Sequence, residues 1–180
     1  MERQPDLKQL FGPIEPTELM KKFFQEHPEA KWNDALAFLL DSFPQVADGQ
    51  VQYLIDGGTA VHLLHPEREE PLDVDIIVRS EEFKRNFVNA RIVVPKTPKD
   101  WCSDHVIPYN EQIVEKIFAL HVQIQFSGRT ILIVCPEFLA LSKSIPWRGK
   151  PQERAKEISD LKLLSVSTEM IQRLKETLGI

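Results

Sequence analysis

The sequence predicts an α+β protein, because patterns typical of strands and of helices both recur along its 180 residues. Apolar residues alternate at Val51, Tyr53 and Ile55, which is the period of a β-strand. Between Trp32 and Phe43, apolar residues recur at spacings of three and four, which predicts a helix with one face in the core. With 42% hydrophobic residues, the chain is long enough to bury one core.

The first 48 residues are predicted to be an N-terminal arm and helices that pack on this core. The arm spans residues 1–16, where three prolines disfavour regular structure. Thr17 can cap a helix that Pro28 ends, and a second helix follows it. Residues 44–50 contain proline, aspartate and glycine, and are predicted to be a loop.

Residues 49–180 are predicted to form the main domain, and together with the N-terminal helices they make a single compact unit. Two apolar runs joined by Ser127-Gly128-Arg129 predict a β-hairpin over residues 121–134. The segment 95–110 is rich in proline and polar residues and receives no assignment. The other predicted elements are a helix over 59–65, a strand over 72–78, a helix over 81–88, a weak strand over 91–94, a helix over 136–143, a helix that ends at 164, and a last helix that Thr168 caps and Gly179 ends.

Charge and cysteine content narrow the function classes. A formal net charge of −5 argues against broad, nonspecific coating of nucleic acid. Cys102 and Cys135 form no Cys-x-x-Cys pattern, so we expect two free thiols in a reducing compartment. The sequence has no long apolar run of the kind that crosses a membrane and no signal-like start. We therefore expect a soluble, cytoplasmic protein with no membrane partner.

Gly57 and Gly58 lie between the first predicted strand of the main domain and a short helix. Because glycine has no Cβ atom, a ligand can come close to the backbone N–H groups of such a turn. The helix that follows adds its free amides and the positive end of its dipole, and Thr59 adds a hydroxyl. These features predict a phosphate site, although a plain turn is an alternative reading because Gly-Gly turns are common.

Asp73 and Asp75 lie two residues apart in the next predicted strand, so their side chains should point to the same face. At that separation one oxygen from each can reach a common Mg²⁺ or Mn²⁺ ion. The alternative is the polar face of an amphipathic strand. Adjacent like charges repel, however, and aspartate is a poor strand former, which favours the metal site.

Gly57-Gly58, a short helix, and then Asp73-Val74-Asp75 in a hydrophobic strand resemble the signature of the DNA polymerase β-like nucleotidyltransferase superfamily. Within it, the pattern is most similar to the minimal and abortive-infection toxin-type nucleotidyltransferases. Residues 136–143 and 154–161 look like that group's helix with a lysine, then a basic residue and an acidic helix start. The resemblance covers roughly residues 50–164. It implies the nucleotidyltransferase fold, a mixed β-sheet flanked by helices, here with extra N- and C-terminal helices.

The resemblance also implies a Mg²⁺-dependent transfer of a nucleotidyl group from an NTP to a hydroxyl of an RNA, a protein or a small molecule. Asp73 and Asp75 would be the catalytic metal ligands, and Gly57, Gly58 and Thr59 would hold the triphosphate. Arg68, in the loop before the aspartates, could reach a phosphate, and a plain loop arginine is the equal alternative.

A basic cluster over residues 143–162 is a second candidate for binding phosphates or RNA. Lys143 is its best single candidate, because this residue ends an otherwise apolar helix. The alternative is a solvated helix face with pairs such as Lys156–Asp160. The cationic residues of the cluster are Lys143, Arg148, Lys150, Arg154, Lys156 and Lys162.

The chain departs from the superfamily at the third carboxylate, which usually comes from a later strand. The matching position holds Gln125, whose amide brings no negative charge, although the register of that strand could differ by one residue. This leaves open a one-metal site, recruitment of Asp56 or Glu137, or loss of activity. The rival function is a catalytically degenerate nucleotide-binding module, or a toxin–antitoxin interaction module with an antitoxin protein as partner. A domain with neither activity is a third reading.

Overall fold

The computed structural model describes residues 22–71, 73–78, 89–93, 103–105, 111–144 and 151–179, and only the backbone at 73, 78, 89–93, 103–105, 111–114 and 151–153. This part of the chain is an α+β structure built on a six-stranded mixed sheet with strand order β6-β5-β4-β3-β8-β7. A separate two-stranded ribbon pairs β1 with β2. The strands are β1 (Val46–Ala47), β2 (Gln50–Val51), β3 (Tyr53–Asp56), β4 (Asp73–Val78), β5 (Asn89–Val93), β6 (Ser103–His105), β7 (Val122–Phe126) and β8 (Arg129–Ile133).

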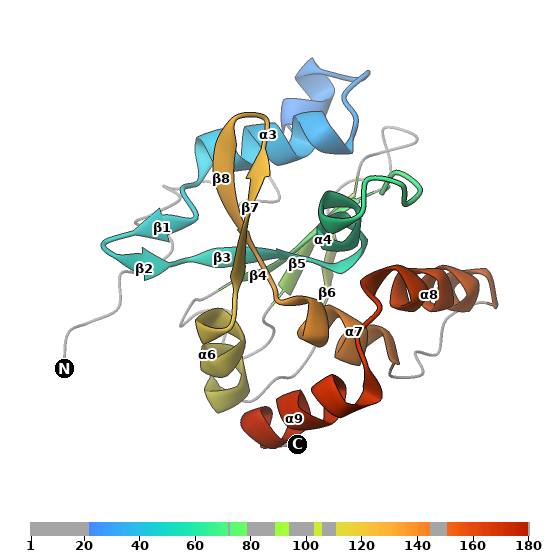
Figure 1. Cartoon of the computed structure of the whole chain (residues 1–180). Coiled ribbons are helices and arrows are strands. Elements are labelled where there is room, and N and C mark those ends of the chain that lie inside the picture. The colour runs from blue at the N-terminus through green and yellow to red at the C-terminus, as the bar shows by residue number, and fades with distance from the viewer. Residues whose placement is uncertain are drawn as a thin grey trace.

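The helices surround this sheet, as Figure 1 shows. Helix α3 lies near the tip of the β7–β8 hairpin, whereas α6, α7 and α9 gather at its other end. Residues 22–26, which follow the undescribed start of the chain, are also helical. The labelled helices are α3 (Trp32–Ser42), α4 (Gly57–Leu64), α6 (Glu111–Ala119), α7 (Pro136–Ser144), α8 (Pro151–Leu164) and α9 (Thr168–Leu178).

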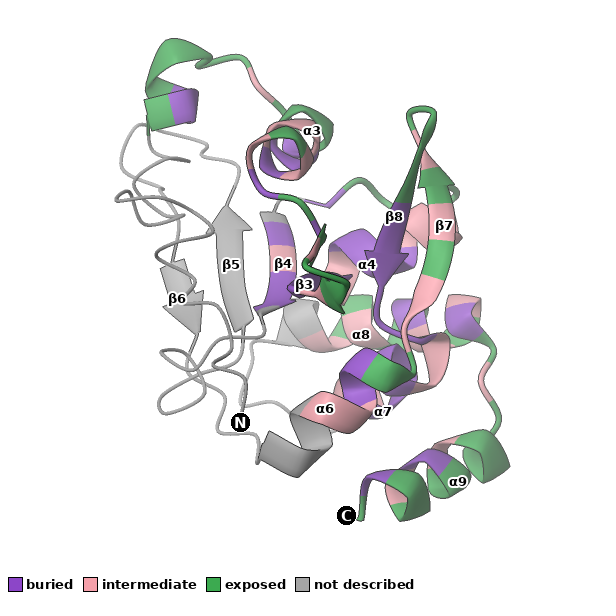
Figure 2. Cartoon of the chain, turned by 90° about the vertical axis from the view of Figure 1, so that its left-hand side faces the viewer, coloured by how far each residue is buried: buried purple, intermediate pink, exposed green. Residues whose placement is uncertain are grey.

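Strand β3 is the centre of the sheet and the source of its mixed character. It pairs antiparallel with β4, where Asp56 lies opposite Asp75. On its other side it pairs parallel with β8, where Ile55 lies opposite Ile133. Because β3 has a neighbour on each side and helices nearby, its apolar residues are buried irrespective of the face to which they point. Tyr53, for example, is only 1% exposed, and Figure 2 shows the buried stretch continuing into β4 and β8.

The buried side chain of Gln45 fills a gap in the pairing between β3 and β8. Its amide nitrogen donates to the carbonyl oxygens of Tyr53 and Leu132, and its amide oxygen accepts from the N–H of Leu132. The amide thus takes the place of missing strand-to-strand hydrogen bonds, so these backbone groups are not left unpaired in the core.

Several predicted elements are confirmed within one or two residues, namely α3, β4, β5, the β7–β8 hairpin, α7 and α9. The hairpin turn uses Ser127 and Gly128, both with positive φ. The predicted helix over 81–88, the arm over 1–16 and the Thr17 cap lie outside the described residues.

Several details differ from the prediction. The predicted loop over 44–50 holds β1 and β2, because Asp48 and Gly49 adopt the positive φ values of a tight hairpin turn. Helix α4 begins at Gly57 rather than Thr59, and helix α6 was not predicted. Ser167, rather than Thr168, caps α9, since its side chain accepts from the N–H of Met170.

No helix in the described ranges is long and apolar enough to cross a membrane. Cys135 is a buried free thiol, and Cys102 lies outside the described residues. Burial raises the pKa of the Cys135 thiol to about 11, and the charge of the neighbouring Glu137 carboxylate adds to the rise. The thiol is therefore protonated at neutral pH, as expected for a structural cysteine.

Candidate functional site

The candidate site lies where β3 ends and the chain turns into α4. Apolar residues of β3 anchor the strand in the core, and Asp56 is the first residue after them with a charged side chain. Gly57 follows with φ of +60°, a left-handed conformation that favours glycine. Asp75 lies opposite Asp56 on β4. The antiparallel pairing therefore brings two carboxylates from neighbouring strands to the start of the helix.

The turn at Gly57 is packed directly against the Asp75 side chain. A Cβ atom added to Gly57 would lie 2.2 Å from Oδ2 of Asp75 and 2.9 Å from its Cγ. No side chain can occupy that space unless Asp75 moves. Glycine is therefore required here twice, once for its φ and once because a carboxylate approaches the bare backbone.

Gly58 makes the corresponding close approach to a positive charge. A Cβ atom added to Gly58 would lie 2.8 Å from Nη2 of Arg68. The guanidinium is held in place by Asp160, with Nε 2.5 Å from Oδ1 and Nη2 3.1 Å from Oδ2. The bidentate geometry fixes the plane of the guanidinium. The Arg68 carbonyl oxygen also lies 2.9 Å from Nδ1 of His62 on α4, which ties the loop to the helix.

Lys143 joins the same group from helix α7. Its Nζ lies 2.8 Å from Oδ2 of Asp160, so one carboxylate from α8 binds two cations from different parts of the chain. The Asp160 side chain is 3% exposed, and the side chains of Arg68 and Lys143 are each 13% exposed. Burial acts to raise the pKa of Asp160, but the hydrogen bonds from Arg68 and Lys143 outweigh it and hold the pKa below its usual value.

Asp56 has a different environment. Its Oδ1 atom is buried and has no hydrogen-bond partner among the described residues. Burial raises the pKa of Asp56, and a hydrogen bond from the Gly57 N–H and the charge of Lys143 oppose this only in part. The site thus contains one carboxylate with two cationic partners and another whose buried oxygen has none.

The structure brings five of the predicted site residues together: Gly57, Gly58, Arg68, Asp75 and Lys143. Thr59 is fully buried in the first turn of α4. Asp73 begins β4, two residues before Asp75, and its side chain is outside the described part. Glu137 lies in the first turn of α7.

Gln125 is not brought to the carboxylates. It pairs with Thr130, and its amide donates to the Thr130 hydroxyl on the exposed hairpin. Ile55 pairs with Ile133, the last residue of β8. Asp56 therefore lies at the level of Val134, the next residue along the chain. Gln125 therefore lies four residues along the sheet from Asp56, about 13 Å at the usual rise per residue, and two strands away.

Asp160 is the site residue that sequence reasoning missed. The Lys156–Asp160 pair named in the alternative reading does not form: Lys156 contacts Glu69 at 3.3 Å, and Asp160 contacts Arg68 and Lys143. Asp160 also lies well inside α8 rather than at its start. The signal in the sequence was an acidic residue within a basic stretch. Its partner Arg68, however, lies 92 residues away in the sequence.

The basic cluster is largely neutralised where it is described. Lys143 and Lys156 have the acidic partners Asp160 and Glu69. Arg154 forms an ion pair with Glu157 and donates to the Lys143 carbonyl oxygen. Arg148 and Lys150 lie outside the described residues. These contacts favour internal ion pairing over an open RNA-binding face.

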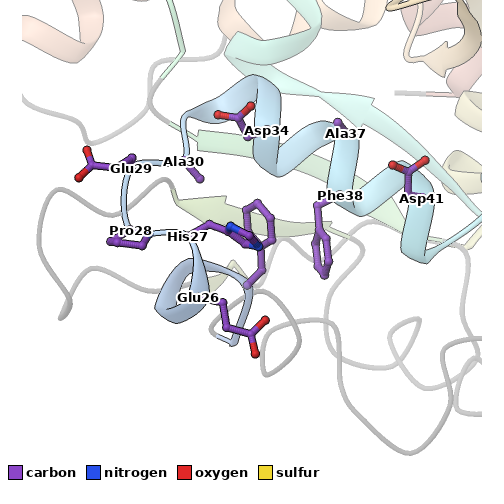
Figure 3. A pocket seen from close by; sticks show the side chains of 10 residues that line it. Glu26, His27, Pro28, Glu29, Ala30, Asp34, Ala37, Phe38 and Asp41 are labelled. Carbon is purple, nitrogen blue, oxygen red and sulfur yellow. The ribbon is translucent and has the colours of Figure 1, made fainter.

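A pocket of about 650 Å³ lies elsewhere, between the helical residues 22–26 and α3. Figure 3 shows Phe38 extending from α3 toward the segment that carries His27. The ring centroids of Phe23 and Phe38 are 4.3 Å apart, so stacked apolar rings form part of its wall. None of its lining residues belongs to the group around Gly57 and Asp160.

Among the side chains that the structure describes, no three or more His, Cys, Asp or Glu residues form a group that could hold a metal ion. Asp73 lies outside that set, so the predicted Asp73–Asp75 metal site stays a prediction. No protein-family model, curated protein or solved structure matches the chain.

Proposed function

We propose that the protein is a Mg²⁺-dependent nucleotidyltransferase that moves a nucleotidyl group from an NTP to a hydroxyl acceptor. One observation carries the proposal. The Gly57–Gly58 turn lies against the Asp75 carboxylate at Gly57 and against the Arg68 guanidinium at Gly58. An NTP bound with a divalent cation needs both an anionic site for the metal and cationic groups for phosphates, next to each other.

Two carboxylates near the Gly57 turn support a divalent cation at this site. Asp75 lies against a bare backbone turn, and Asp56 contributes a buried oxygen without a partner. Asp75 and Asp73 would hold Mg²⁺ or Mn²⁺, which take oxygen ligands. When bound, the cation would supply charge neutralisation for the phosphate oxygens and lower the pKa of a coordinated hydroxyl.

The cationic half of the site would bind the triphosphate. Arg68 presents a planar guanidinium beside Gly58, and Lys143 reaches the same carboxylate from α7. Asp160 holds both cations in place before any ligand arrives, so less side-chain freedom is lost on binding. Positioning and charge neutralisation of this kind supply most of the rate in phosphoryl chemistry.

The test is nucleotidyl transfer from NTPs labelled at the α-phosphate, with Mg²⁺ and with RNA, protein and small-molecule acceptors offered separately. We expect pyrophosphate release and label on one acceptor class. Asp75→Asn should abolish both, and Asp41→Asn is the matched control because this aspartate is exposed on α3. No release by the folded wild-type protein with any acceptor would reject the activity.

A second function is supported by the position of Gln125. Strand β7 brings no carboxylate to Asp75, since Gln125 lies four residues along the sheet from that level. The alternative is therefore a degenerate module that binds a nucleotide, or that forms a toxin–antitoxin complex. Such a protein would bind NTP with Mg²⁺ and release no pyrophosphate, so calorimetric binding and the transfer assay together separate the two functions.

A further inference from the structure

We propose that the Asp56 carboxylate is a direct ligand of the divalent cation, together with Asp75, and supplies the carboxylate that β7 does not. This inference rests on the metal-dependent function proposed above. It concerns a residue that precedes the glycine turn rather than one on a later strand.

The strand register is the first argument. Asp56 and Asp75 are direct partners across the antiparallel β3–β4 pair. Directly opposed residues point to the same face of a sheet, with Cβ atoms about 5 Å apart. Like charges in this position repel each other. A cation bound by one oxygen of each carboxylate would offset the repulsion, and the two carboxylates would form a metal site.

The second argument is independent of the pairing. Oδ1 of Asp56 has almost no exposed surface and accepts no hydrogen bond from any described residue. Buried polar atoms nearly always have a partner, because leaving one unpaired costs free energy. The Gly57 N–H and the Lys143 ammonium act on this carboxylate, yet they leave Oδ1 unsatisfied. An oxygen of this kind is the donor that a hard cation prefers.

Asp160 shows why the missing partner is better explained by a cation than by Lys143. Lys143 lies 2.8 Å from Oδ2 of Asp160 and is held there. The lysine therefore serves Asp160, and Asp56 receives only its longer-range charge.

The experiment is Mn²⁺ titration by calorimetry on the full chain, without nucleotide. The proteins are wild type, Asp56→Asn, Asp75→Asn and the exposed control Asp41→Asn. Asparagine keeps the shape and removes the charge. Because each carboxylate adds to the affinity for a hard cation, we expect Asp56→Asn and Asp75→Asn each to weaken Mn²⁺ binding by at least about tenfold. Asp41→Asn should bind as wild type does.

A second variant, Asp56→Cys, tests direct contact with the metal and keeps the proposal testable if Asp56→Asn does not fold. Asp56→Cys should lose Mn²⁺ affinity and gain affinity for Cd²⁺ relative to wild type, because thiolates select softer metals. A carboxylate that acts only through packing or a shared proton would not produce that change in metal preference.

The outcomes are distinguishable. Normal Mn²⁺ affinity in folded Asp56→Asn, with loss in Asp75→Asn, would overturn the role of Asp56 and leave the proposed function intact. An unchanged Cd²⁺ affinity in folded Asp56→Cys would do the same. If wild type binds neither Mn²⁺ nor NTP with Mg²⁺, the proposed function fails and this inference fails with it.

Discussion

Two turns of the molecule contain the same kinds of residues but differ in what surrounds them. The tip of the β7–β8 hairpin and the turn from β3 into α4 each contain a glycine with positive φ, Gly128 and Gly57. Each also has an Asp–Arg pair nearby at 2.5 Å, Asp41–Arg129 at the hairpin and Asp160–Arg68 at the turn. At the hairpin a Cβ on the glycine would meet nothing within 4 Å, whereas at Gly57 it would meet Asp75.

Burial is the other difference between the two regions. The side chains of Arg129 and Asp41 are 41% and 63% exposed, and those of Arg68 and Asp160 are 13% and 3% exposed. An exposed pair is screened by water and contributes little, while a buried one must be complete or it destabilises the fold. At the hairpin, glycine thus serves the conformation of the backbone alone. At the Gly57 turn, by contrast, charged side chains lie against bare backbone.

The largest expected effect comes from breaking the buried pair. Asp160→Asn leaves two mostly buried cations without their carboxylate, and should lower the free energy of unfolding by about 3–5 kcal/mol. Asp41→Asn removes the same chemistry from the hairpin pair, and should change it by less than about 1 kcal/mol. Urea unfolding of both variants measures the difference. Similar losses in the two variants would show that the contrast in burial has no energetic consequence.

The next effect separates backbone strain from close approach. Gly128→Ala imposes a left-handed alanine in open space and should cost about 1–2 kcal/mol. Gly57→Ala adds a contact 2.2 Å from Asp75 Oδ2, so its total should be about 2–4 kcal/mol. The measurement is again urea unfolding, with metal and nucleotide binding followed on the folded fraction. Equal costs would mean that Asp75 moves aside freely.

A smaller effect should appear on acidification. The folded-state pKa of Asp160 lies below the unfolded value of about 3.9. Its contribution to stability is therefore complete above that value and is lost as the pH falls through the folded pKa. We expect the difference in unfolding free energy between wild type and Asp160→Asn to be constant near neutrality and to shrink below about pH 4. A difference that grows on acidification would contradict the sign of the shift.

Local patterns predicted the α+β class and most elements, because hydrophobic period and turn residues act within a few positions. The errors have local causes as well. Helix α4 begins at Gly57 although glycine disfavours helices, so the start was predicted two residues late. The Asp48-Gly49 turn carries a known hairpin signal, but its strands have only two residues each.

The candidate site was predictable only in part. The Gly-Gly turn and the strand with two aspartates are local patterns, and strand β4 does bring Asp75 to Gly57. The cluster on Asp160 is not local, because its three members come from the loop before β4, from α7 and from α8. Single-sequence reasoning cannot choose which arginine reaches a given carboxylate. The strand period predicts the face of the sheet on which Gln125 lies, but it does not predict how far along the strand direction Gln125 lies from Asp56.

The smallest expected effect tests that last point. Gln125→Asp adds a carboxylate on exposed β7, four residues along the sheet from Asp56 and two strands away. At a separation of more than a Debye length in ordinary salt, an exposed charge is largely screened. Calorimetric titration with Mn²⁺ should therefore give the same affinity for Gln125→Asp and wild type, with a stability change below about 0.5 kcal/mol. A clear gain in affinity would mean that the hairpin bends toward the carboxylates when a cation binds, and that the exposed hairpin belongs to the site after all.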